Sequence, residues 1–94
     1  MTLSLQTRVR ATPDTMVQEL AGESVLLNLA SENYFGLDEV GTRMWQVLTT
    51  APSIQAAYEV LLAEYDTEAE RLRQDLGDLL EKLVSNGLVE EANP

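Results

Sequence analysis

Two different periods of hydrophobic residues divide the chain into two parts. In the first part, Val25, Leu27 and Leu29 fall on one face of an extended segment. Leu26 and Asn28 fall on its other face. This period of two is typical of a half-buried β-strand. In the second part apolar residues recur every three to four positions, which indicates α-helices.

Three strands are predicted in the first part, over residues 16–20, 24–29 and 34–37. Gly22 lies between the first two and can adopt the positive φ that a tight hairpin connection needs. The polar stretch 31–33 forms the next turn. Residues 1–14 carry little pattern, so we expect a loosely ordered N-terminal arm ahead of one domain that spans residues 15–91.

The first two of three predicted helices have clear signals at both ends. Asp38 and Ser53 can each accept a hydrogen bond from the free N–H groups of a first helical turn. Pro52 ends the first helix, because the residue before a proline disfavours the helical conformation. The second helix is expected to end near Tyr65.

The third helix is expected over about residues 68–86. Thr67 and Glu70 have the spacing of a capping box at its start. Gly87 is suited to end the helix, with Leu88 folding back onto it. Three strands followed by three helices predict an α+β fold of winged-helix type, with a three-stranded antiparallel sheet followed by three helices.

The charge of the chain argues against a nucleic-acid partner. The 94 residues include 16 Asp and Glu but only 6 Lys and Arg, a net charge of −10. In a winged helix the third helix would read DNA, yet residues 66–86 carry a net charge of −3. Such a surface repels phosphate groups, so we expect neither nucleic acid nor an anionic membrane as a partner.

Several kinds of chemistry lack the residues that they need. The chain has no His and no Cys, which excludes a Ser-His-Asp triad, a histidine zinc site and a cysteine nucleophile. The glycines match no phosphate-binding loop. We therefore expect no catalysis, no metal and no cofactor. With no signal peptide or membrane span in the sequence, the expected location is the cytoplasm.

The third helix has a broad apolar surface. Its apolar residues span an arc of roughly 140°, more than the ~100° that facing a core requires. These residues are Leu72, Leu76, Leu79, Leu80, Leu83 and Val84. One margin can therefore face a groove with Asp75, Lys82 and Arg71 at its polar rim. A fully buried stripe with a solvated flank is the alternative.

The third predicted strand is short and is expected at an edge of the sheet. An edge strand presents unpaired backbone N–H and C=O groups, which must be protected or used. Phe35 and Trp45 are expected to pack in the core. Tyr34 lies on the opposite face from Phe35 and is the better candidate for a contact with a ligand.

A series of short motifs runs through residues 16–91. They are Val25-Leu26-Leu27-Asn28, Tyr34-Phe35-Gly36-Leu37-Asp38-Glu39-Val40-Gly41, Met44-Trp45, Glu64-Tyr65-Asp66, Asp75-Leu76, Leu79-Leu80, Leu83 and Gly87-Leu88-Val89. Their order and spacing resemble the PqqD-like family. The resemblance implies a RiPP recognition element, a domain that captures the leader segment of a ribosomally made precursor peptide.

The resemblance also implies a binding site and partners. The leader would lie as an added strand on the third strand, with side chains docked against the third helix. The implied peptide-binding residues are Asn33, Tyr34, Phe35, Gly36, Leu37, Leu72, Asp75, Leu76, Leu79, Lys82 and Leu83. The second partner would be a modifying enzyme such as a radical-SAM enzyme, or a leader protease. Quinone-cofactor and lasso-peptide pathways both stay open, and a monomer or weak dimer is expected.

The leading hypothesis is therefore a non-catalytic adaptor that binds a leader peptide by strand addition. Backbone pairing would supply affinity, and pockets for alternate side chains would supply selectivity. Two alternatives remain at this point: a winged-helix transcriptional regulator that binds DNA, and a structural accessory subunit that binds a folded protein.

Overall fold

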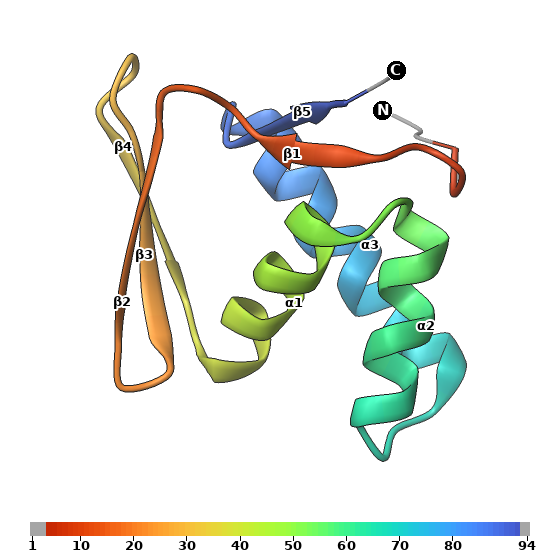
Figure 1. Cartoon of the computed structure of the whole chain (residues 1–94). Coiled ribbons are helices and arrows are strands. Elements are labelled where there is room, and N and C mark those ends of the chain that lie inside the picture. Colours follow the sequence, from red (N-terminus) through yellow and green to blue (C-terminus); the bar gives the residue numbers. More distant parts are fainter. Residues whose placement is uncertain (1–3, 93–94) are drawn as a thin grey trace.

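A computed structural model describes residues 4–92 of the chain and confirms the predicted α+β fold, a three-stranded antiparallel sheet followed by three helices (Figure 1). In chain order the elements are β1 (Val9–Ala11), β2 (Thr15–Leu20), β3 (Glu23–Asn28), β4 (Asn33–Leu37), α1 (Glu39–Thr50), α2 (Ile54–Glu64), α3 (Ala69–Ser85) and β5 (Val89–Glu91). β2, β3 and β4 form the sheet in that order, and β1 and β5 form a separate two-stranded sheet.

The hairpin between β2 and β3 has a two-residue connection, with Leu20 paired to Glu23. Gly22 has the predicted positive φ, at 85°. Ala21 has a positive φ as well, at 56°. Positive φ at both central residues is what a type I′ turn requires, because its twist matches that of the flanking strands.

Within the expected loosely ordered arm, residues 9–11 form strand β1, while residues 1–3 lie outside the described residues. Val9 is only 1% exposed and pairs with Glu91 of β5, at the other end of the chain. Just before it, the carbonyl of Thr7 accepts a hydrogen bond from the N–H of Ile54 at 2.8 Å. A three-residue strand is too short to show an alternation of apolar and polar residues in the sequence. Strand β1 is therefore recognised only from its pairing with residues far away in the chain.

The predicted starts of α1 and α2 are confirmed. The side chain of Asp38 accepts a hydrogen bond from the N–H of Gly41 at 2.8 Å. Ser53 accepts one from the N–H of Ala56 at 3.0 Å. Each bond satisfies an N–H group that has no partner within its own helix.

At α3 the predicted end is confirmed and the helix begins within one residue of the predicted start, but the predicted capping box is wrong. The N-cap is Glu68, which makes no side-chain capping bond, so the capping box of Thr67 and Glu70 does not form. Gly87 ends the helix with φ 69°, and the N–H of Leu88 donates to the carbonyl of Leu83 at 2.9 Å. That bond belongs to the Schellman motif, in which the glycine adopts the left-handed conformation.

Helix α1 is the central layer of the molecule. It packs against β3 and β4 on one side and against α2 on the other, and α3 packs against α2 and β5 (Figure 1). As predicted, Trp45 of α1 is buried in the core, and the partly buried Phe35 packs against this core. No helix within residues 4–92 combines the length and hydrophobicity needed to cross a membrane.

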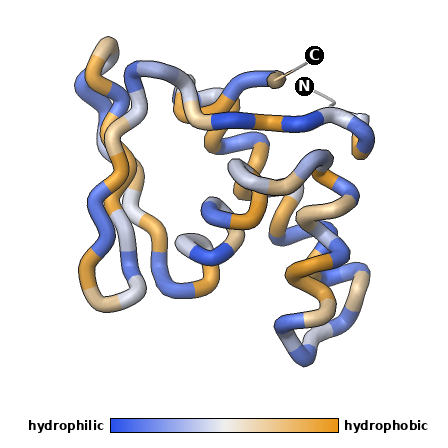
Figure 2. The backbone as a smooth tube through the Cα atoms, viewed as in Figure 1, coloured by the Kyte–Doolittle hydropathy of each residue, from blue (hydrophilic) through white to orange (hydrophobic). Residues whose placement is uncertain are grey.

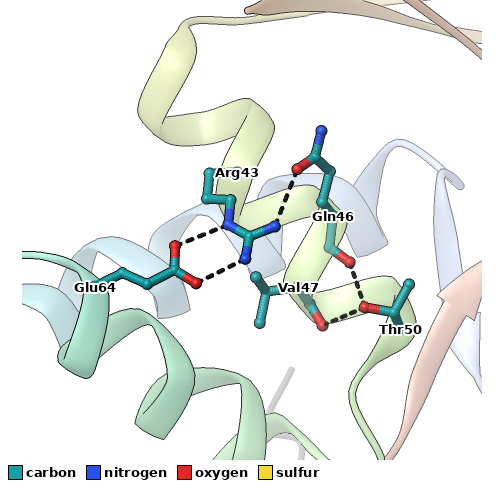
Figure 3. A network of polar contacts seen from close by, with 5 residues as sticks. All are labelled: Arg43, Gln46, Val47, Thr50 and Glu64. Carbon is teal, nitrogen blue, oxygen red and sulfur yellow. Dashed lines mark hydrogen bonds and ion pairs between the residues drawn. The ribbon is translucent and has the colours of Figure 1, made fainter.

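A polar network joins α2 and α1 on the surface (Figure 3) and continues to Glu19 of β2. The guanidinium of Arg43 donates to both carboxylate oxygens of Glu64, with Nε–Oε1 at 2.8 Å and Nη2–Oε2 at 2.6 Å. Arg43 also donates to Gln46, whose amide donates to Glu19. Hydrogen bonding to Arg43 holds the pKa of Glu64 below its ordinary value.

Candidate functional site

The β4 strand lies at an edge of the sheet, as predicted for the third strand. Among the strands of residues 4–92 it pairs only with β3. Its other side therefore offers backbone N–H and C=O groups to a further strand. The strand is five residues long, enough to guide a short extended peptide.

The residues of β4 alternate between the two faces of the sheet. Phe35 pairs with buried Leu26, so it faces inward, toward the helices. Tyr34 pairs with Leu27 and faces outward, where it is 75% exposed. Only the inward-facing residues of β4 are therefore on the side of the helices, and Tyr34 offers its ring to solvent.

The core takes up part of the peptide-binding surface that was predicted on α3. Three of the six predicted residues are buried in the core: Leu72, Leu76 and Leu83. Leu79 is partly buried and packs against the core from its margin. Asp75 and Lys82 are exposed, and Asp75 lies 3.9 Å from Arg71 in an ion pair. The surface of α3 open to a ligand on this side is therefore Leu79 with a charged rim.

The sheet and α3 are joined by the side chain of Asn28, at the end of β3. It is 8% exposed, and its Nδ2 donates to the carbonyls of Asn86 at 3.1 Å and Gly87 at 3.2 Å. Its Oδ1 accepts from the N–H groups of Ala30 at 2.9 Å and Ser31 at 3.2 Å. The signal in the sequence was one asparagine among apolar residues of a strand, which does not reveal its partners.

Two threonines reinforce this connection. Thr12 donates from Oγ1 to the carbonyl of Gly87 at 2.8 Å. Thr15 donates from Oγ1 to the carbonyl of Leu88 at 3.1 Å. We refer to Thr12, Thr15 and Asn28 with the carbonyls of residues 86–88 as the sheet–helix junction. It lies beside the start of β4, because Asn28 pairs with Asn33.

A pocket of about 400 Å³ lies on the opposite flank of α3, between that helix and α2. Its apolar lining includes Leu5, Ile54, Tyr58, Leu76, Leu80 and Val84. Arg73 stands over the ring of Tyr58, with its guanidinium carbon 5.3 Å from the ring centre. Of the predicted peptide-binding residues only Leu76 lines this pocket, so it is distinct from the β4 side of α3.

The outward face of the sheet is apolar and exposed. We call it the outer sheet face, formed by Met16, Leu20, Val25, Leu27 and Tyr34. No described element covers it in Figure 1, and Figure 2 shows hydrophobic positions interleaved with hydrophilic ones along these strands. A hollow of about 500 Å³ lies at its hairpin end, next to Gly36. Such a patch on a small protein is typical of an interaction surface.

Within residues 4–92 no group of acidic side chains is arranged to hold a metal ion. The arrangement instead offers backbone pairing at β4, an apolar margin at Leu79 and an apolar sheet face. These are the components of a surface that binds polypeptide.

Comparisons with known proteins bear on this surface. The sequence profile of the family described as coenzyme PQQ synthesis protein D (PqqD) matches residues 23–89. The structure of TbiB1 in complex with the TbiA(beta) leader peptide is similar, with a TM-score of 0.80 and 29% identity over 90% of this chain and 99% of that one. Lasso peptide synthetase B1 complexed with the leader peptide has a TM-score of 0.77 and 25% identity over 88% and 98%. No curated protein matches the chain.

Proposed function

Since this chain belongs to the PqqD family, we propose that it is a non-catalytic adaptor that binds the leader segment of a ribosomally made precursor peptide and presents it to an enzyme. The observation that carries the proposal is the similarity to two structures of leader-peptide complexes, which covers nearly the whole of both proteins. The open edge of β4 supports it, because an extended peptide can be bound there without rearranging the sheet.

In the proposed complex the leader is a fourth strand beside β4. Its backbone pairs with residues 33–37, and its side chains point alternately to the two faces. The inward side chains lie beside Phe35 and reach Leu79, with Asp75 and Lys82 at the rim. Leu72, Leu76 and Leu83 support Leu79 from within the core and do not contact the peptide. This narrows the surface expected from the sequence.

The outward side chains of the leader would continue the outer sheet face past Tyr34. The enzyme that receives the leader therefore docks on this face, where it contacts adaptor and leader together. The enzyme is a modifying enzyme or a leader protease. Support comes from the exposure of Met16, Leu20 and Val25 and from their continuity with the leader strand through Leu27 and Tyr34.

The test of the leader site compares the two flanks of α3. Leu79 and Val84 are both partly buried and both pack against the core, but only Leu79 lies on the proposed peptide side. In Leu79→Asp a charge replaces an apolar contact at the centre of the interface, and we expect a loss of about 2 kcal/mol or more, roughly thirtyfold in affinity. Val84→Asp is the matched control and should bind within about twofold of wild type.

Affinity is measured by calorimetry with a synthetic leader peptide of a precursor identified among the neighbouring genes, and folding is followed by circular dichroism. The proposed site is wrong if Leu79→Asp stays folded and binds as tightly as Val84→Asp. A wild-type chain that binds no leader peptide contradicts the proposed function itself.

A further inference from the structure

We propose that Asn28 is a positioning residue for leader binding, because its side chain holds the start of β4 at a set distance from the end of α3. The inference rests on the proposed function, since it concerns the same strand and helix. Asn28 is buried on the inner side of β3, the central strand of the sheet, so it acts through β4 and not by touching the peptide.

The carboxamide of Asn28 uses its full hydrogen-bonding capacity. Both of its N–H groups donate to the end of α3, at the carbonyls of Asn86 and Gly87. Both of its oxygen lone pairs accept from the turn that leads into β4, at Ala30 and Ser31. A carboxamide has two donor and two acceptor positions, and a buried carboxamide is fully satisfied only when all four are used. One side chain therefore bridges the turn and the helix end.

The sheet and α3 share one apolar core, but the side-chain hydrogen bonds that join the sheet to the end of α3 within residues 4–92 come from Asn28 and Thr15. The sheet packs on α1, whereas α3 packs on α2 and β5. Beyond Asn28, the side chains of the sheet–helix junction come from Thr12 and Thr15, on the side of β2. Asn28 pairs with Asn33, the first residue of β4, so a shift of Asn28 passes directly into that strand. An added strand must lie about 4.8 Å from β4 while its side chains contact α3. The distance between β4 and α3 therefore determines whether the leader fits.

Gly87 is matched to Asn28. A Cβ built on Gly87 would lie 2.9 Å from Nδ2 of Asn28, closer than non-bonded atoms approach. Its φ of 69° also favours glycine. The close approach of the amide is therefore possible only because position 87 has no side chain. Gly87→Ala would displace Asn28 from the other side of the contact, and it would also strain the end of α3.

The other end of β3 offers a matched control. Ser24 is buried on the same face, and its Oγ lies 2.7 Å from Oγ1 of Thr42 on α1. Ser24 and Asn28 are both buried polar residues of one strand. Ser24 ties the strand to α1, whereas Asn28 ties it to α3. Loss of either side chain weakens the fold, but only loss of Asn28 should change the gap that admits the leader.

The experiment compares Asn28→Ala, Asn28→Asp and Ser24→Ala with the wild-type full-length chain. The probe is the synthetic leader peptide used above, titrated by calorimetry at a temperature where circular dichroism shows all four proteins folded. We expect Asn28→Ala to bind about tenfold more weakly and Ser24→Ala to bind within about twofold of wild type. Asn28→Asp keeps the acceptors but sets a carboxylate against two carbonyls, so it should bind no better than Asn28→Ala.

A second measurement needs no peptide. Hydrogen exchange of the free proteins should show the amides of residues 33–37 exchanging about tenfold faster in Asn28→Ala than in Ser24→Ala, after matching global stability with denaturant. A purely structural role would accelerate both variants equally. Equal exchange in the two variants overturns the inference, as does wild-type affinity in Asn28→Ala. A wild-type chain that binds no leader peptide instead overturns the proposed function, and with it this role in binding.

Discussion

Both faces of the β2–β3–β4 sheet carry apolar residues, but only the inner face is buried, and only along β3 and β4. On the inner face Leu26 and Leu37 are covered by α1 and belong to the core. On the outer face Val25 is 45% exposed and Tyr34 is 75% exposed. Strands β3 and β4 therefore carry a core surface on one side and a free surface on the other, whereas no residue of β2 is buried. Hydrophobicity alone does not decide burial; the position of the neighbouring layer does.

This difference is sharpest within β3. Val25 is an exposed residue between two buried ones, Ser24 and Leu26, because successive side chains point to opposite faces. A protein that left this face uncovered without a use for it would carry an aggregation hazard. The outer sheet face is therefore best understood as the docking surface proposed above for the enzyme.

The largest effect is expected from a charge on the inner face. Leu26 is 0% exposed, and Leu26→Asp leaves both a cavity and an unpaired buried charge. We expect a loss of about 4 kcal/mol or more, comparable with the whole stability of a small domain. Val25→Asp, one residue away, should lose about 1 kcal/mol or less.

Urea denaturation followed by circular dichroism measures both variants. Similar losses in the two would show that the outer face is buried in solution, for example in a dimer, and size-exclusion chromatography would then detect the assembly. The comparison between the faces would no longer hold.

A smaller effect is expected on delivery to the enzyme. Val25→Asp puts a charge in the outer sheet face, where the side chain points away from α1 and α3 and its backbone pairing with Gly36 of β4 is kept. We expect leader affinity within about twofold of wild type, and processing of the precursor about tenfold slower at limiting adaptor concentration. The assay follows product by mass spectrometry, using a modifying enzyme or protease identified among the neighbouring genes. Processing at the wild-type rate would exclude this face as the docking surface.

The smallest effect concerns the polar network beside the inner face, in which Arg43 binds Glu64 (Figure 3). The pKa of Glu64 is lowered in the folded chain by its hydrogen bonds to Arg43. A lowered folded-state pKa stabilises the protein above the unfolded pKa, and this contribution is lost as the pH falls through the folded value. Glu64→Gln should therefore lower stability slightly near neutral pH and have no effect in acid.

The measurement compares urea midpoints at about pH 7 and about pH 3, in low salt because both side chains are partly exposed. Glu59→Gln is the control on the same helix, since Glu59 hydrogen-bonds to Gln55 instead of an arginine. An equal effect of Glu64→Gln at both pH values would mean that the ion pair does not contribute to stability in solution.

Local signals in the sequence were sufficient for most elements of the fold. The period of β3, the caps Asp38 and Ser53 and the stop at Gly87 depend only on residues close in the chain, and the structure confirms them. The capping box predicted at the start of α3 was wrong, because Thr67 and Glu70 have the required spacing but the helix begins one residue later. Spacing shows that a bond is possible, and the local backbone decides whether it forms.

The candidate site was only partly accessible to sequence reasoning. The pattern predicted the short edge strand and a broad apolar margin on α3. It did not distinguish the leucines that are buried in the core from those that stay accessible. Leu79 stays at the margin while Leu83 is wholly buried, although both lie on the same side of the helix. The difference depends on where α2 and β5 pack, which no local window of sequence contains.

The sequence by itself determined the kinds and order of the three sheet strands and three helices and the absence of His and Cys chemistry, because periodicity, capping and composition act over a few residues or none. It did not reveal β1 or β5. The tertiary structure alone decided which face of β3 is buried, that β1 pairs with β5, and that Asn28 bonds to Asn86 and Gly87. Each of these depends on contacts between residues far apart in the chain. Such contacts form only when the layers pack. The packing energy then selects one set of partners among several that local sequence signals do not distinguish.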